Sequence, residues 1–207
     1  YKNVGDMNNY GVEGDFHFVL ANNKNVQWDF NLNASYLKNT VVSLADNVKD
    51  SKAYDANGKE YDGFTSGSFF VAEGSSMYTW YTYDYAGVDP ETGKSLWWKN
   101  ILDEEGLPTG ERETTDDYSA ASKTLTGMST LAPLFGGFGT SVSAYGIDFS
   151  INFTYQVGGK QLDGSFVTCV SSPSSSQNGY NYHVVLVDAW TPENKSASVP
   201  RFQYADT

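Results

Sequence analysis

The residue types that most often carry catalysis are scarce in this sequence and scattered along it. There is one cysteine, Cys169, and there are two histidines, His17 and His183, which lie far apart in the chain. A nucleophilic thiol needs an activating partner, and neither histidine neighbours the cysteine. No Ser–His–Asp arrangement, glycine-rich phosphate loop or zinc-ligand spacing is present. We therefore expect no catalytic residues and predict that the protein is not an enzyme.

Oxygen ligands for a cation occur at short spacing in one polar segment. Asp55, Asn57, Glu60 and Asp62 all fall within residues 46–63. A calcium loop needs more ligands at strict positions, so a hairpin turn with solvated carboxylates is the favoured interpretation. We expect no metal site and no cofactor, while the question of calcium in the loops stays open.

The best candidate for a ligand-binding surface is a group of aromatic residues in the middle of the sequence. Its members are Trp80, Tyr81, Tyr83, Tyr85, Trp97 and Trp98. Aromatic rings stack on the apolar faces of sugars and cover peptide side chains, so the group predicts contact with a glycan or a peptide. The same residue types build membrane-interface belts and pack in cores, and from the sequence these structural roles are favoured over ligand contact.

Charge and length limit the classes of function. The chain has 207 residues and a formal net charge of −12, so it repels polyanions, and we predict no nucleic-acid partner. The length suits one large β domain or two small ones. No apolar run is long enough for a transmembrane helix.

The strands that must position these side chains are predicted by two stretches with the same alternation of apolar and polar residues. The stretches read WDFNLNASY at 28–36 and IDFSINFTY at 147–155. A period of two is the signature of a β-strand with unlike faces. Each has a partner strand before it, and the two-residue link Tyr145-Gly146 predicts a hairpin that pairs Ala144 with Ile147.

Two environments produce such strands. One is a soluble sheet with one face on a core, and the other is a membrane barrel with lipid outside and a wet interior. The repeated length, the aromatic ends and the uncharged centres favour the barrel. The predicted lipid-facing residues are Phe16, Phe18, Trp28, Phe30, Leu32, Tyr36, Ile147, Phe149, Ile151, Phe153 and Tyr155.

The remaining segments differ in length in a way that also favours a barrel. Short links at 21–26 and 145–146 alternate with long polar excursions, and outer-membrane barrels combine tight periplasmic turns with long extracellular loops. We expect residues 46–63 and 99–122 to be loops and residues 165–171 to be extended.

Four stretches resemble one protein family. They are NVGDMNNYGVEGDF, YDYAGVDPETGKSLWW, GGFGTSVSAYGIDFSINFTYQVGGKQLD and DAWTPENKSASVPRFQ. The first is similar to a strand entry of TonB-dependent outer-membrane receptors, and the others are similar to segments of the SusC/RagA branch from Bacteroidetes. The matches come in family order and cover most of the chain outside the loops.

The resemblance implies an all-β fold in which residues 1–207 form an antiparallel transmembrane segment of a 22-stranded barrel with long extracellular loops. The plug domain and the terminal strands would lie outside this sequence. It further implies a bacterial outer-membrane transporter for TonB-dependent import of glycans or peptides, in contact with outer-membrane lipid. A SusD-like surface lipoprotein and TonB would be its partners. The alternatives from the residues alone are a soluble β-sandwich carbohydrate-binding module and a glycoside hydrolase fragment.

Overall fold

The computed structural model describes residues 5–171 and 181–202, and the chain divides into two compact units. The first unit comprises Tyr1–Lys52, Tyr61–Trp80 and Gly127–Lys160. The second comprises Ala53–Glu60, Tyr81–Thr126 and Gln161–Thr207. Each unit is described by itself below.

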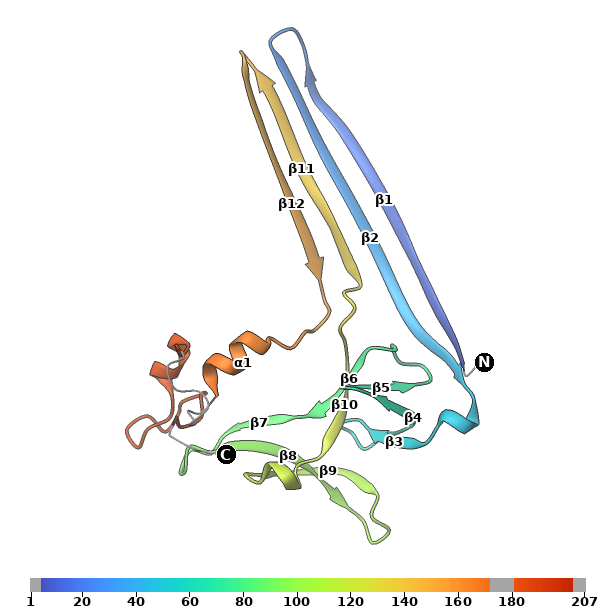
Figure 1. Cartoon of the computed structure of the whole chain (residues 1–207), viewed down its shortest axis with the longest axis vertical. Helices are drawn as coiled ribbons and strands as arrows, with labels where there is room; N and C mark the ends of the chain where they lie inside the picture. Colours follow the sequence, from blue (N-terminus) through green and yellow to red (C-terminus); the bar gives the residue numbers. More distant parts are fainter. Residues whose placement is uncertain (1–4, 172–180, 203–207) are drawn as a thin grey trace. The chain divides into compact units, whose positions relative to one another are not determined.

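The first unit contains a four-stranded antiparallel sheet with the order β1-β2-β11-β12 (Figure 1). The strands are β1 (Gly5–Asn22), β2 (Val26–Leu44), β11 (Leu134–Ala144) and β12 (Ile147–Val157). In the hairpin of β11 and β12, Ala144 pairs with Ile147 and Val142 pairs with Phe149. This is the predicted register. A slip by one residue would have moved every apolar side chain of one strand to the other face.

The links between these strands are very unequal in length. β1 and β2 are joined by residues 23–25 and β11 and β12 by Tyr145-Gly146, whereas residues 45–133 separate β2 from β11. Tyr145 and Gly146 have φ angles of 52° and 84°, and two positive φ angles in succession are typical of the type I′ turn that matches the twist of a hairpin. Short links are confirmed at the two predicted places, whereas strands occupy much of the segments that were expected to be long excursions.

The two similar sequence stretches lie in β2 and β12, on either side of β11. Rows of directly paired residues therefore run across the sheet. One row is Phe16, Leu32, Phe138 and Phe153, and the next is Phe18, Phe30, Thr140 and Ile151. Because paired residues project to the same side, the aromatic and aliphatic residues of these rows share one face.

The other strands are shorter and form two further sheets among the described residues. One has the order β10-β6-β5-β4-β3, with β3 (Ser51–Tyr54), β4 (Glu60–Ser66), β5 (Phe69–Ala72), β6 (Thr79–Tyr83) and β10 (Lys123–Ser129). The other has the order β7-β8-β9, with β7 (Tyr85–Val88), β8 (Ser95–Leu102) and β9 (Pro108–Thr115). The helical segments are η1 (Asp46–Val48), η2 (Tyr118–Ala120), α1 (Gly164–Val170) and η4 (Val184–Asp188).

The expectation that residues 46–63 and 99–122 are loops is wrong. The first range contains β3 and the start of β4, and the second contains part of β8 and all of β9. β9 is rich in polar residues, and Glu113 of this strand forms an ion pair of 3.0 Å with Lys99 of β8. A hairpin stabilised by backbone pairing and charge pairs lacks the apolar alternation that reveals a strand.

The expectation of an extended segment at 165–171 is also wrong, because α1 occupies most of it. The Asp163 side chain accepts a hydrogen bond of 2.9 Å from the Phe166 N–H and so caps the helix. The apolar residues Phe166, Val167, Cys169 and Val170 have the spacing of one helix face as well as an approximate alternation.

Buried side chains are few among the described residues. Phe70, Val71 and Ala72 of β5 are at most 3% exposed, and Phe70 is the largest side chain that is completely buried. In the same unit Val41 is buried, and its backbone exchanges hydrogen bonds of 2.9 Å with Ser75 and Gly74. No helix in the described ranges has the length and apolarity to cross a membrane.

Candidate functional site

The predicted lipid-facing residues all lie on one face of the four-stranded sheet, as the register shows. Phe16, Phe149 and Phe153 are 51%, 56% and 46% exposed, and Phe30 and Leu32 are half-buried between neighbouring side chains. An apolar face of this size would promote aggregation in water. It matches the outward band of a membrane barrel, which contacts hydrocarbon.

Polar atoms on this face are paired within the sheet. The Thr140 hydroxyl donates to the Asp29 carbonyl oxygen and accepts from the Trp28 indole N–H, both at 2.8 Å. The Tyr155 hydroxyl donates to the Asn33 carbonyl oxygen at 3.0 Å, and its ring lies across Gly136, where a Cβ would meet the ring at 2.9 Å. Hydrocarbon offers no hydrogen-bond partner, so internal pairing is what this environment demands.

The opposite face carries mainly polar side chains. His17 Nε2 and Asp29 Oδ1 are 2.9 Å apart, and the amide of Asn152 lies across Gly139, where any Cβ would collide with it. Asp148 and Ser150 continue this face and are exposed. Hydrogen-bonding side chains without an apolar cover suit a water-filled interior.

The two outer strands of this sheet have one free edge each within the described residues. β1 pairs with β2 alone and β12 with β11 alone. Unpaired backbone groups at a strand edge do not occur in the hydrocarbon region of a membrane. A sheet with this apolar face therefore needs further strands at both edges, as part of a closed barrel.

The second unit contains a continuous surface of aromatic rings, which we call the aromatic strip. Its members are Tyr81, Tyr83, Tyr118, Trp97 and Tyr85. The ring centroids of Tyr83 and Tyr118 are 4.4 Å apart, those of Tyr118 and Trp97 are 5.0 Å apart, and those of Trp97 and Tyr85 are 5.4 Å apart. Tyr118 and Tyr85 are 52% and 43% exposed, so the strip presents ring surface to solvent.

A cation adjoins one end of the aromatic strip. The Lys123 ammonium lies 5.7 Å and 5.6 Å from the ring centroids of Tyr81 and Tyr83, the range of cation–π contact. Desolvation raises the pKa of Tyr81, and the neighbouring Tyr83 raises it further. Desolvation likewise raises the pKa values of Tyr85 and Tyr118. These phenols therefore remain hydrogen-bond donors at neutral pH.

Trp98 follows Trp97 in β8 but faces the other way, as successive strand residues do. Its ring lies 5.0 Å from the Arg112 guanidinium, which is 12% exposed and forms an ion pair of 2.9 Å with Asp84. Asp84 stands between Tyr83 and Tyr85 in the sequence. The ion pair therefore holds the backbone from which these two rings of the aromatic strip project.

Trp80 lies in the first unit and has structural contacts there. Its ring centroid is 4.8 Å from that of Phe69, and its indole N–H donates to the Lys160 carbonyl oxygen at 2.8 Å. Of the six aromatic residues singled out from the sequence, the structure thus brings together Tyr81, Tyr83, Tyr85 and Trp97.

The sequence interpretation did not identify Tyr118, a member of the strip, or Lys123, which adjoins it. Tyr118 lies in the acidic range 99–122, which we expected to be a loop, and it is the one aromatic residue in that range. The first turn of η2 positions it, since the Asp117 carboxylate accepts hydrogen bonds from the Ser119 N–H and hydroxyl. The signal available in the sequence was that Tyr118 is an isolated aromatic residue within a polar segment.

The residues considered for chemistry serve local structure. His183 lies near Cys169, but the contact is a backbone hydrogen bond of 3.0 Å, and the His183 ring accepts from the Val185 N–H through Nδ1. Asp55 accepts hydrogen bonds from the N–H groups of Asn57 and Lys59, which supports the hairpin-turn interpretation. Within the described residues, no group of three or more His, Cys, Asp or Glu side chains is arranged to hold a metal ion.

Known proteins similar to this chain are receptors and transporters. No family model matches it. A TonB-dependent receptor P3 from Formosa agariphila is 26% identical over 206 residues, covering 97% of this chain and 19% of that protein. The solved structure of the RagAB peptide transporter superposes with a TM-score of 0.72 at 27% identity, covering 98% of this chain and 20% of that one. An open-open state of the RagAB peptide importer gives a TM-score of 0.71 at 26% identity.

The fold, the two-faced sheet and these matches define the chain as part of an outer-membrane β-barrel. The resemblance to TonB-dependent receptors of the SusC/RagA kind that the motifs predict is confirmed, as is the expected bacterial outer-membrane location. The chain spans about a fifth of the length of these relatives, as expected for a fragment of the barrel.

Proposed function

We propose that this chain forms part of the barrel wall of a TonB-dependent nutrient importer. The observation that carries the proposal is the single-layered sheet with one apolar and one polar face, whose apolar side chains remain exposed. The eleven predicted lipid-facing residues would contact hydrocarbon, and the opposite face would line the aqueous interior. A soluble sandwich would instead cover Phe16 and Phe149 with a second sheet.

The cargo that we propose is a peptide or a glycan, delivered by a SusD-like surface lipoprotein. Two similar structures are described as a peptide transporter and a peptide importer, which favours a peptide. TonB would act through a region outside this chain. The segment itself would contribute a scaffold and a binding surface, with no chemical step.

The aromatic strip is the part of the chain that we propose to contact cargo. Its rings offer apolar faces to peptide side chains or sugars, and the adjoining Lys123 ammonium can attract a carboxylate. Trp98 and Trp80 would stabilise the fold and make no contact with cargo. Arg112 covers the Trp98 ring, and Phe69 packs on the Trp80 ring.

The face assignment is tested by attaching an environment-sensitive fluorophore to single cysteines in the full-length receptor, with Cys169→Ser as background. Brominated lipid in vesicles should quench the fluorophore attached at Phe149→Cys or Phe153→Cys. Aqueous iodide should instead quench the fluorophore attached at Ser150→Cys. Equal access of both quenchers to neighbouring positions would overturn the wall assignment.

The cargo proposal is tested separately with a protein digest and a partial polysaccharide hydrolysate as fluorescent probes. Trp97→Ala and Tyr118→Ala should weaken uptake of one probe several-fold, while Tyr145→Ala, which removes an 81% exposed ring from a short turn, should not. Unchanged uptake by both strip variants would remove the aromatic strip from the cargo path without affecting the assignment of the wall.

A further inference from the structure

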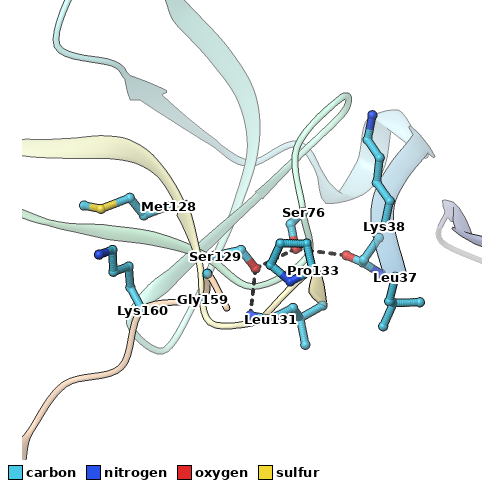
Figure 2. Close-up of a pocket in the computed structure, with 11 residues that line it drawn as sticks. Leu37, Lys38, Ser76, Met128, Ser129, Leu131, Pro133, Gly159 and Lys160 are labelled. Atoms are coloured by element: carbon cyan, nitrogen blue, oxygen red, sulfur yellow. Dashed lines mark hydrogen bonds between the residues drawn. The ribbon is translucent and has the colours of Figure 1, made fainter. Parts of the chain in front are cut away.

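A cavity of about 320 Å³ lies in the first unit, beside the start of β11 and the end of β12 (Figure 2). Leu37 of β2, Leu131 and Pro133 before β11, and Met128 of β10 give it a mainly apolar lining. Ligand pockets usually have volumes of about 300–1,000 Å³, so this cavity is at the small end of the range. It suits one large side chain of a ligand better than a whole cargo molecule.

The strand register places this cavity on the polar face of the long sheet. Leu37 stands between Tyr36 and Lys38, which project from the apolar face, and successive strand residues alternate. Figure 2 shows the side chains of Leu37 and Lys38 extending from β2 in opposite directions. Asn39 also lines the cavity, and its amide donates to the side chain of its register partner Asn9 at 2.6 Å. The cavity therefore adjoins the face that we propose to line the aqueous interior.

The cavity lies toward the end of the sheet that is away from the short turns. Residues 23–25 and Tyr145-Gly146 form these turns, and Leu37 lies in the half of β2 that is farther from them. Outer-membrane barrels have short turns on the periplasmic side and long loops on the extracellular side. The cavity therefore belongs to the extracellular end of the interior face, where imported cargo enters a barrel.

Apolar side chains gather beside the cavity on a face that is otherwise mainly polar. Phe135 of β11 pairs with Ser35, two residues before Leu37, and so projects from the same face. Its side chain is 38% exposed. Farther toward the short turns, β2 carries Asn33 and Asn31 on this face. A ligand that covers the apolar area would be bound favourably, because that area leaves water.

Hydrogen bonds hold the walls of the cavity in place. The Ser76 hydroxyl donates to Asn39 Oδ1 at 3.0 Å and lies 3.0 Å from the Ser129 hydroxyl. The Leu37 N–H donates to the Pro133 carbonyl oxygen at 2.8 Å, which ties β2 to the chain before β11. A site that is already formed loses little conformational freedom when a ligand enters it. Because these polar groups pair with one another, a guest would meet mainly the apolar side chains.

We propose that this cavity binds one apolar side chain of a peptide that passes into the barrel. The inference rests on the proposed function, which assigns the polar face to the interior and favours a peptide as cargo. Met128 suits guests of different shape, because an unbranched thioether side chain adapts to its contacts. A sugar would instead require an aromatic platform, and the lining offers aliphatic side chains in its place. The cavity thus selects cargo by a side chain, separately from the aromatic strip.

The test uses the full-length receptor in nanodiscs, with the tryptic digest of one water-soluble protein as the probe. Mass spectrometry compares the peptides retained after washing with those in the digest. The parent should enrich peptides that contain leucine, methionine or phenylalanine. The double variant Leu37→Asn, Met128→Gln replaces two lining residues by polar residues of similar size, and it should lower this enrichment several-fold. Met128 is 45% exposed, so the change to glutamine should leave the fold intact.

Two further variants control for folding and for the general loss of apolar surface. Val19→Asn, Leu107→Gln removes two exposed apolar side chains elsewhere and should behave as the parent. Val19 projects from the same polar face but lies near the short turns. Leu37→Met, Met128→Leu keeps the lining apolar and should retain the enrichment.

Several outcomes would overturn the pocket. One is equal enrichment in the parent and in Leu37→Asn, Met128→Gln, and another is an equal loss in the Val19 control. If the receptor itself fills the cavity, the polar double variant would lower the unfolding midpoint of the peptide-free receptor and leave the enrichment unchanged. Retained peptides with the composition of the digest would remove the pocket alone, whereas retention of no peptide would also remove the peptide cargo. Fluorophore quenching at Phe149→Cys and Ser150→Cys reports on the wall independently.

Discussion

The long sheet of the first unit and the short sheet of the second unit are stabilised in different ways. β1 and β2 have 18 and 19 residues, and their side chains alternate between two unlike faces without a buried core between layers. β7 and β8 have 4 and 8 residues, and aromatic contacts and ion pairs surround them. The first arrangement depends on what lies on either side of the sheet, whereas the second depends on individual partners within the protein.

The turn of the second unit at Asp89–Gly93 illustrates the second kind of stabilisation. Three residues from the C-terminal segment contact it. The Trp190 indole donates to the Pro90 carbonyl oxygen at 3.0 Å, the Lys195 ammonium lies 2.7 Å from the Glu91 carboxylate, and the Arg201 N–H donates to the Gly93 carbonyl oxygen at 2.8 Å. A single substitution should therefore have local effects here and face-dependent effects in the long sheet.

The largest effect is expected from a charge on the apolar face of the long sheet. Ile151→Arg should destabilise the full-length barrel by about 2–4 kcal/mol, because the guanidinium would lie in hydrocarbon. Ser150→Arg, one residue away on the polar face, should change stability by less than about 0.5 kcal/mol. Denaturant unfolding from lipid vesicles measures both. Equal costs would show that the two faces meet the same environment.

A smaller effect is expected at the docked turn. Gly93 has a φ of 72°, and a Cβ there would collide with the Trp190 ring. Gly106 has a φ of 81° and nothing within 4 Å of its added Cβ. Gly93→Ala should therefore cost about 1–3 kcal/mol more than Gly106→Ala, since the backbone strain is common to both. Indistinguishable unfolding curves for the two variants would contradict the docking of Trp190.

The smallest effect is expected at the hydrogen bonds on the apolar face. Thr140→Val keeps the shape but removes the acceptor of the Trp28 indole N–H, and it should cost about 1 kcal/mol. Thr154→Val makes the same change on the polar face of the neighbouring strand and should cost less. Unfolding of the two variants from vesicles, monitored by tryptophan fluorescence, measures both changes in stability. A larger loss of stability in Thr154→Val would reverse the assignment of the faces.

The success of prediction from the sequence differs between the two regions for a physical reason. Alternation places Phe149 and Ile151 on one face and, with a two-residue turn, also gives their pairing, because hairpin register depends on neighbours in the chain. β9 contains no such alternation. The ion pair between its Glu113 and Lys99 is recognisable only once β8 lies beside β9. The sequence did not predict the helix α1, because the spacing of its apolar residues fits both a strand and a helix. The structure has the helix, which Asp163 caps.

By itself, the sequence determined the two-faced strands, the short turns and the family resemblance, since all three depend on residues close together in the chain. The tertiary structure alone decided that Tyr118 and Lys123 join Tyr83, that Trp80 supports Lys160, and that Leu37 and Met128 line one cavity. These contacts join residues from different strands, and loop closure brings them together by paths that no local pattern encodes.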